Sequence, residues 1–241
     1  MECGQRGIRP KEPRELMAEY GADPAVEEAL AGLARQRRGN ARWWTEYERQ
    51  LAPSYVELLS AEASASAVVA WGPMQVPDLL QTPGHARVIA AADPSIPKDF
   101  EAATVTATLH RQRVTLNERG LPVTVVIGEA ALRQRAGGPT VVRAQISHLA
   151  DLAEQVPNIT IRLLPFITGA LPAGGAGGFT VLQFGAVPAI CLVHLAGPSD
   201  GLCPDIPEAA DSYLRVYAHL QARALSPERT ARRLWELVRT Q

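Results

Sequence analysis

The stretch Val76-Pro77-Asp78-Leu79-Leu80-Gln81-Thr82-Pro83-Gly84-His85-Ala86-Arg87 is the least generic part of this chain. Pro77 indicates an extended or turn-like entry, because its ring locks φ and restricts the residue before it. Thr82 and Pro83 are the residue types preferred at the N-cap and the first position of a helix, so a helix is predicted through Ile89. His85 would lie in its first turn, where a cation is unfavourable, so another reason for a histidine is worth seeking.

Two other segments are predicted to line one cleft together with residues 76–87. One is residues 111–135, and the other is the glycine-rich loop at residues 169–178. A glycine-dense loop can hold phosphate, but a P-loop requires a Lys-Ser/Thr pair and this loop contains no lysine. The loop is therefore interpreted as a flexible lid or a linker.

The composition is that of an ordinary globular protein, with 241 residues, 46% of them hydrophobic, and a net charge of -1. A protein that mainly grips phosphate backbones shows a basic excess, so this balance argues against a stand-alone nucleic-acid-binding protein. The cysteines Cys3, Cys191 and Cys203 have no C-x-x-C spacing, and neither a metal nor another cofactor is expected. No apolar run reaches the ~20 residues of a membrane helix and no signal peptide is visible, so a soluble cytoplasmic protein is predicted.

Hydrophobic periodicity and helix-capping residues predict the α+β class. A helical N-terminal part, residues 1–41, is expected to precede a mixed domain, residues 42–241, of about four strands packed with helices. The predicted helices are residues 13–20, 23–38, 55–71, 100–119 and 139–156, with two more opened by Pro207 and Pro227. The predicted strands are residues 123–127, 159–164, 179–184 and 189–195. The aromatic cluster at residues 43–47 continues at helical spacing, which is typical of a core or interface stripe.

A set of motifs in a fixed order carries a family resemblance. The motifs are L-L-Q-T-x-x-x-A-R at residues 79–87, R-Q-R-V-T-L at 111–116, E-A-A-L-R-Q-R-A-G-G-P at 129–139, P-N-I-T-I-R-L-L-P-F at 157–166, G-G-F-T-V-L-Q-F at 177–184 and A-L-S-P-E-R at 224–229. Taken together they resemble the C-terminal domain of actinobacterial helix-turn-helix regulators of the antitoxin-like kind, over about residues 42–241. The resemblance implies a sensing or partner-binding module from DNA-binding regulators that are often paired with a small partner protein.

The chain departs from that family pattern in two respects. Only the last helices of a helix-turn-helix domain are expected within residues 1–41, so direct DNA binding is not expected. The family pattern favours glycine where Asp78 stands, tyrosine where His85 stands and a carboxylate near His194, and Trp71-Gly72 replaces a Tyr-Glu pair. New ionisable groups in a cleft are what an acquired acid/base function requires, and neutral drift is the alternative.

Two functions stay open from the sequence. The first is a regulator-derived protein that binds a small hydrophobic molecule or a small partner protein, with a homodimer as a further possibility. The second is an enzyme recruited from the regulator scaffold, such as a cyclase or isomerase of natural-product biosynthesis that works in the former effector cleft. Its candidate catalytic residues are Asp78 and His85, followed by Glu129 and His194.

The predicted ligand-binding residues combine cations and apolar walls. Arginines that would hold a carboxylate or an enolate are joined by one amide and three aromatic side chains: Arg87, Arg111, Arg113, Gln81, Trp71, Phe166 and Phe179. The alternative for the three arginines and Glu129 is that they form ion pairs that hold the fold. His148 and His219 lie on ordinary amphipathic helices and are interpreted as structural or exposed.

Overall fold

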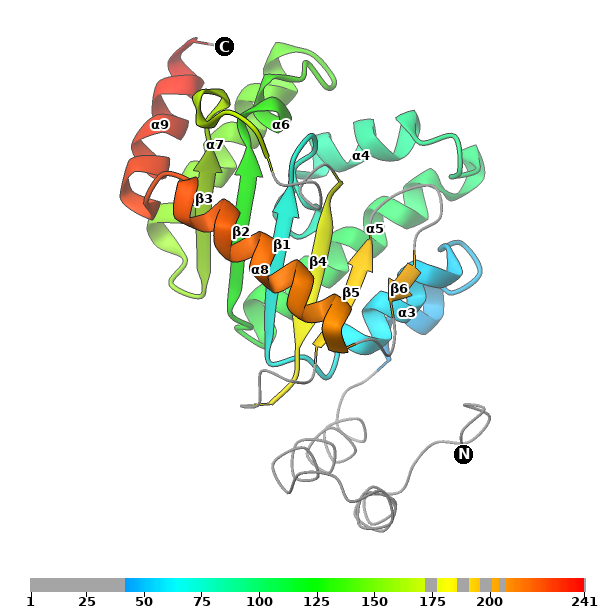
Figure 1. Cartoon of the computed structure of the whole chain (residues 1–241). Helices are drawn as coiled ribbons and strands as arrows, with labels where there is room; N and C mark the ends of the chain where they lie inside the picture. The colour runs from blue at the N-terminus through cyan, green and yellow to red at the C-terminus, as the bar shows by residue number, and fades with distance from the viewer. Residues whose placement is uncertain (1–41, 172–176, 186–190, 196–200, 204–206, 241) are drawn as a thin grey trace, which may run out of the picture.

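The computed structural model describes residues 42–171, 177–185, 191–195, 201–203 and 207–240, and shows one sheet with helices on both faces (Figure 1). The predicted α+β class is confirmed. The helices predicted at residues 13–20 and 23–38, the domain boundary at residue 41, and residues 172–176 of the glycine-rich loop lie outside the described residues.

Six described strands form the sheet in the order β3-β2-β1-β4-β5-β6. The strands are β1 (Ala67–Gly72), β2 (Val123–Gly128), β3 (Ile159–Leu164), β4 (Phe179–Gln183), β5 (Cys191–Leu195) and β6 (Gly201–Cys203). β1, β2 and β3 pair in parallel, and β1-β4, β4-β5 and β5-β6 pair antiparallel. Parallel neighbours such as β1, β2 and β3 can be joined only by long crossover connections, and in this chain those connections contain helices.

Most of the described helices lie in the two crossover connections between the parallel strands, and the others lie before β1 and after β3. Before β1 come η1 (Trp43–Tyr47) and α3 (Pro53–Glu62). Between β1 and β2 come η2 (Asp78–Leu80), α4 (Pro83–Ala92), η3 (Lys98–Phe100), α5 (Glu101–Gln112) and the π-helix η4 (Arg113–Glu118). Between β2 and β3 come α6 (Glu129–Arg133) and α7 (Pro139–Gln155), and later come η5 (Phe166–Thr168), α8 (Pro207–Arg223) and α9 (Pro227–Thr240).

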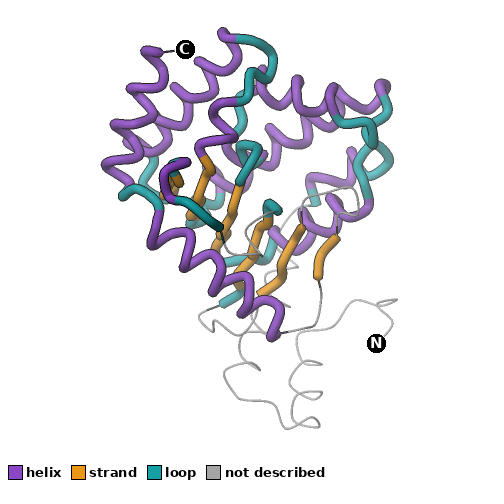
Figure 2. Tube along the Cα trace, turned by 45° about the horizontal axis from the view of Figure 1, so that its top comes forward, coloured by secondary structure: helices purple, strands orange, loops and turns teal. Residues whose placement is uncertain are grey.

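Two apolar cores lie on the two faces of the sheet. The larger one joins the sheet to α3, α7 and α9, and the smaller one lies under α8, which crosses the other face diagonally (Figures 1 and 2). Alternation along β2 divides its side chains between them, with Val125 and Ile127 in the larger core and Val126 in the smaller. All three are buried, as expected of a strand covered on both faces.

The helix predicted at residues 55–71 was wrong in its second half. The helix ends at Glu62, and Ala67–Gly72 is β1, paired with β2 on one side and β4 on the other. A strand buried on both faces has a continuous apolar sequence, so its period is indistinguishable from that of a buried helix. Missing β1 and the short β6 is also why the predicted number of strands was too low.

Candidate functional site

The segment of residues 76–87 leaves the carboxyl end of β1 and is held in place by glutamine side chains. Thr82 caps α4 as predicted, since its hydroxyl accepts the backbone N–H of His85 at 3.2 Å. Three amide side chains bind the backbone of this segment: Gln81 Nε2 to Val76 O (2.8 Å), Gln112 Nε2 to Asp78 O (2.5 Å) and Gln81 O (2.9 Å), and Gln145 Nε2 to Leu80 O (2.8 Å) with its Oε1 accepting from Thr82 N (2.7 Å). Gln81 therefore satisfies buried backbone, which is a structural role.

Arg111 is the centre of a buried ion cluster. Its side chain donates to Glu62 through Nε (3.0 Å) and Nη2 (2.5 Å), and to Asp78 through Nη1 (2.5 Å). Arg111 is 1% exposed and Glu62 is 2% exposed, and the Thr115 hydroxyl also donates to Glu62 at 2.7 Å. Burial by itself would lower the pKa of Arg111, but the Asp78 and Glu62 carboxylates hold that pKa well above its ordinary value.

Asp78 is thereby an ion-pair partner in this geometry. Its Oδ2 accepts from Arg111 and from the Tyr55 hydroxyl at 3.0 Å, and its Oδ1 accepts from the backbone N–H of Leu79 at 2.9 Å. Burial, followed by the nearby Asp78 charge, raises the pKa of Tyr55, so Tyr55 remains a hydrogen-bond donor. A carboxylate with both oxygens engaged in this way is poorly placed to accept a proton from a substrate.

His85 has a different environment. It is 5% exposed, and neither ring nitrogen has a hydrogen-bond partner among the described residues. Burial lowers the pKa of His85, so the imidazole is neutral near pH 7. Buried polar side chains normally have a hydrogen-bond partner, so the environment of His85 requires an explanation. The catalytic role predicted for His85 would be such an explanation.

Glu129 holds together the carboxyl ends of β2 and β3. Its Oε1 accepts from Arg133 at 2.7 Å and lies 3.7 Å from Arg233, and its Oε2 accepts the backbone N–H of Phe166 at 3.1 Å. Burial would raise the pKa of Glu129, but Arg133 and the Phe166 N–H outweigh it and lower that pKa. The Phe166 side chain itself is exposed, as is that of Ile167.

The remaining predicted residues do not meet at one place. Trp71 and Phe179 are cross-strand neighbours in the core beneath α8, where the Phe179 ring lies 4.9 Å from that of Tyr213. His194 is buried in β5 opposite Thr180, and Arg87 is exposed on α4. The structure brings together Asp78 with Arg111 and Glu129 with the backbone of Phe166, but it distributes the rest over both faces of the sheet.

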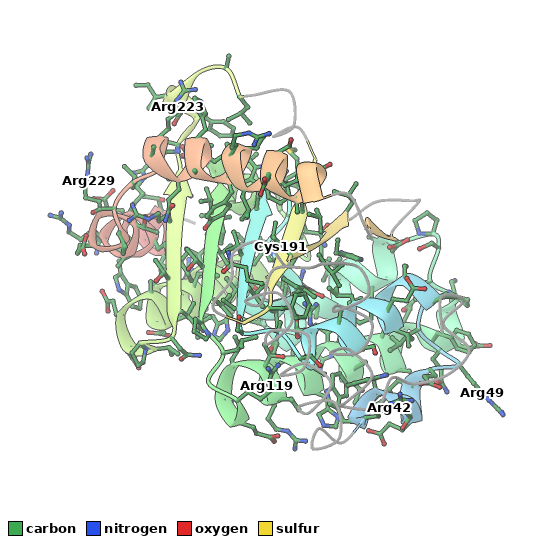
Figure 3. The ribbon with its side chains drawn as sticks, turned by 60° about the horizontal axis from the view of Figure 1, so that its bottom comes forward. Arg42, Arg49, Arg119, Cys191, Arg223 and Arg229 are labelled. Carbon is green, nitrogen blue, oxygen red and sulfur yellow. The ribbon has the colours of Figure 1, made fainter. Side chains whose placement is uncertain are left out.

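A pocket of about 320 Å³ lies on the helix-rich side of the sheet, between η1, the end of α3, α5 and η4. Its lining combines aromatic, apolar and charged side chains: Trp43, Trp44, Leu59, Glu62, Ala63, His110, Arg113, Val114, Thr115, Glu118 and Arg119. Figure 3 shows Arg119 on this side of the molecule and Arg223, at the end of α8, on the other. Arg113 is the predicted ligand-binding residue that lines this pocket.

A ring stack and a chain of polar contacts form one wall of the pocket. The His110 ring lies 4.4 Å from the Trp43 ring with 32° between their planes. His110 Nε2 is 2.7 Å from Arg113 Nη2, His110 Nδ1 is 3.5 Å from the Glu46 carboxylate, and Arg113 Nε is 3.2 Å from Glu118. The sequence signal was the aromatic cluster at residues 43–47 together with His110-Arg111, but nothing in the spacing showed that they would meet.

The described residues contain no group of acidic, histidine and cysteine side chains that could hold a metal ion. Within the same residues, every helix is too short or too polar to cross a membrane. Comparison with known proteins found one family model, described as a domain of unknown function (DUF5753), which matches residues 55–236. No curated protein and no solved structure matched the chain. Because residues 55–236 are most of its 241 residues and hold the ion cluster and most of the pocket lining, the chain belongs to the DUF5753 family.

Proposed function

We propose that this protein is a regulator-type binding protein that recognises a small molecule in the pocket between η1, α3, α5 and η4. The pocket is the observation that carries the proposal, since a volume of about 320 Å³ and a mixed aromatic and polar lining are typical of small-molecule sites. The net charge of -1 argues against a role that depends on gripping phosphate backbones.

The carboxylates that an acid/base reaction would use also support binding over chemistry. Asp78 is bonded to Arg111, Tyr55 and a backbone N–H, while Glu129 is bonded to Arg133 and to the backbone of Phe166. Both are engaged in holding elements together, so their replacement would be felt first in stability. A small partner protein is the other ligand class that the resemblance implies, and it would use a surface and not a pocket.

Filling the pocket tests the proposal directly. Ala63 lines the pocket at the end of α3, so Ala63→Phe should occupy it, whereas Ala218→Phe adds the same ring at an exposed position of α8. Ligand-observed NMR with a library of aromatic fragments should give binders that Ala63→Phe loses and Ala218→Phe keeps. A library without binders, or binders indifferent to Ala63→Phe, would contradict a small-molecule site in this pocket.

Recruitment as an enzyme is a second candidate, and His85 is the observation that favours it. A neutral buried imidazole that has no hydrogen-bond partner among the residues the structure describes can act as a proton acceptor once a substrate reaches it. Products made by the enzymes encoded beside this gene should be offered to the wild type, His85→Asn and Asp78→Asn. Conversion that His85→Asn abolishes would support the enzyme, and unchanged substrate with all three proteins would reject it.

A further inference from the structure

We infer that the pocket takes a planar aromatic acid, that is, a flat ring system bearing a carboxylate. This inference rests on the proposed function and names the ligand class of the same pocket. Three features carry it: an aromatic wall, two arginines that line the pocket beside it, and the exposed, exchangeable carboxylate partner of one of them, Arg113.

The wall selects for a flat apolar ligand. Trp43 stacks on His110 at 4.4 Å and meets the rings of Trp44 and Tyr47 edge-on at 5.9 Å and 6.2 Å. These contacts hold the Trp43 indole in one orientation. Ligand binding therefore does not have to immobilise this side chain, which lowers the entropy cost of binding. Leu59 and Val114 extend the apolar surface of the lining, so a ring system gains both burial and ring contacts there.

The charges around the pocket are arranged unevenly, although they balance in number. Arg113 and Arg119 line the pocket with Glu62 and Glu118, and Glu62 is also bound from behind by the buried Arg111 through Nε and Nη2. Asp78 binds the other edge of the Arg111 guanidinium and does not line the pocket. An anion is therefore favoured locally, at the guanidinium groups of Arg113 and Arg119.

Arg119 presents one of these guanidinium groups in a constrained form. Its Nη1 and Nη2 donate to the carbonyl oxygens of Glu62 (2.7 Å) and Ala65 (2.6 Å), so backbone dipoles hold it instead of a carboxylate. Burial lowers the pKa of Arg119, with the Glu62 charge opposing, but a guanidinium stays protonated under all ordinary conditions. A ligand carboxylate would lower the free energy of this half-buried cation.

Arg113 is the residue that would bind the ligand carboxylate. A guanidinium only donates, so His110 Nε2 is the acceptor in its contact with Arg113, and His110 Nδ1 faces Glu46. The Arg113–Glu118 pair is 60% and 55% exposed, and such pairs stabilise a protein by little. A ligand carboxylate can therefore replace Glu118 on Arg113 while His110 keeps the guanidinium in position.

The π-helix explains why these groups share one side. In η4 the backbone N–H of Arg119 bonds to Val114 O at 2.9 Å, one residue further back than in an α-helix. The widened turn directs Arg113, Val114, Thr115 and Glu118 to the pocket, from a segment of six residues. Single π-turns within helices are often found at functional sites.

Three probes that share one ring system test the ligand class: 2-naphthoate, 2-naphthalenemethanol and 2-naphthylmethylammonium. Isothermal titration calorimetry with the full chain should give naphthoate an affinity about 3-fold above the alcohol, since an ion pair with a largely exposed arginine adds little. The ammonium probe should bind weakest. Arg113→Gln should reduce naphthoate to the level of the alcohol and leave the alcohol unchanged, while the exposed Arg87→Gln changes neither.

Glu118→Gln gives a test in the opposite direction. It removes the carboxylate that competes with the ligand for Arg113, so the affinity for naphthoate should increase. Equal affinities, a preference for the ammonium probe, or a naphthoate preference that Arg113→Gln leaves intact would overturn the aromatic acid. In those cases, alcohol binding that Ala63→Phe abolishes would leave the proposed function standing. If none of the three probes binds the wild type, the aromatic acid is rejected, and the fragment library with Ala63→Phe decides the proposed function separately.

Discussion

Arg111 lies almost fully buried between two carboxylates that come from distant parts of the chain. It joins Glu62 at the end of α3 to Asp78 in η2, and thereby fixes the exit of β1 against α5. A buried pair of this kind is weak support for net stability, but removing one member leaves an uncompensated charge inside the protein. The role of Arg111 is thus to bind the Glu62 and Asp78 carboxylates and so to hold α3, η2 and α5 together.

Arg111→Met should lower the free energy of unfolding by about 3–5 kcal/mol, because Glu62 is left buried without its cation. Arg113→Met removes the same side chain two residues later from an exposed pair and should cost less than about 1 kcal/mol. Urea unfolding measures both. Similar losses for the two variants would show that burial of the Arg111 cluster does not decide its energetics.

His85 makes stability depend on pH in a predictable direction. Its pKa in the folded protein is below the ordinary value near 6.5, so between these two values the unfolded chain binds more protons than the folded one. Its contribution is complete above about pH 6.5 and is lost as the pH falls toward the folded pKa.

His85→Leu should therefore lose less stability than the wild type when urea unfolding is repeated at about pH 7.5 and 5.5. Part of the pH dependence of the free energy of unfolding should remain in His85→Leu. Burial lowers the pKa of His148 as well, although the Asp151 charge acts to raise that pKa. His219→Gln, at an exposed position, is the control. A pH dependence identical in His85→Leu and wild type would mean that His85 takes up its proton as readily in the folded protein as in the unfolded chain.

The junctions between elements show where the fold tolerates no side chain. β2 ends at Gly128, and a Cβ there would lie 2.5 Å from the carbonyl oxygen of Pro73 in the loop after β1. This close approach positions Glu129 next to the end of β3. Gly128 is thus required because two backbones meet, although its own φ is ordinary for any residue.

Gly128→Ala should destabilise the protein by more than about 2 kcal/mol, since the Pro73 loop has to move. Gly177→Ala is the matched control, because no atom of the described residues lies within 4 Å of its Cβ position, and it should be within about 0.5 kcal/mol of the wild type. Thermal unfolding of both variants measures the difference. If Gly177→Ala proves as destabilising as Gly128→Ala, the close approach at Pro73 is not the cause.

At the scale of the whole molecule, the protein has a central sheet scaffold and a peripheral region around η1. β1 and β2 have strands on both sides and are covered on both faces, while η1 is attached mainly through its rings to α5 and α3. A peripheral element of this kind can open locally, because only a few buried contacts have to break. The pocket lies at the boundary between the two regions.

Hydrogen exchange followed by mass spectrometry should find β1 and β2 exchanging only through global unfolding and η1 exchanging through local opening. Saturating 2-naphthoate should slow exchange in η1 and η4 and leave the first turn of α7 unchanged. Slowing that is spread evenly over the chain, or confined to α7, would place the probe elsewhere.

Much of the fold was predictable because it depends on local chemistry. The N-cap at Thr82, the start of α7 at Pro139 and the strand at Ile159–Leu164 follow from capping residues and β-branched runs. β1 was not predictable, because a strand buried on both faces has no alternating pattern. The site was predicted least well, since Arg113 and His110 meet Trp43 only through the packing of η1 on α5.

The sequence by itself determined the α+β class, the positions of β2 and β3, and the helix start at Thr82 within residues 76–87, because capping, periodicity and backbone restriction act over a few residues. Only the tertiary structure decided what those residues do. Arg111 pairs with Glu62 across 49 residues and with Asp78 across 33, so Asp78 became a part-buried ion-pair partner, while the ring of His85 has no hydrogen-bond partner within the described part of the chain. Partner choice for a buried charge depends on which elements pack together, and that is settled by burial of the whole core rather than by neighbours in the chain.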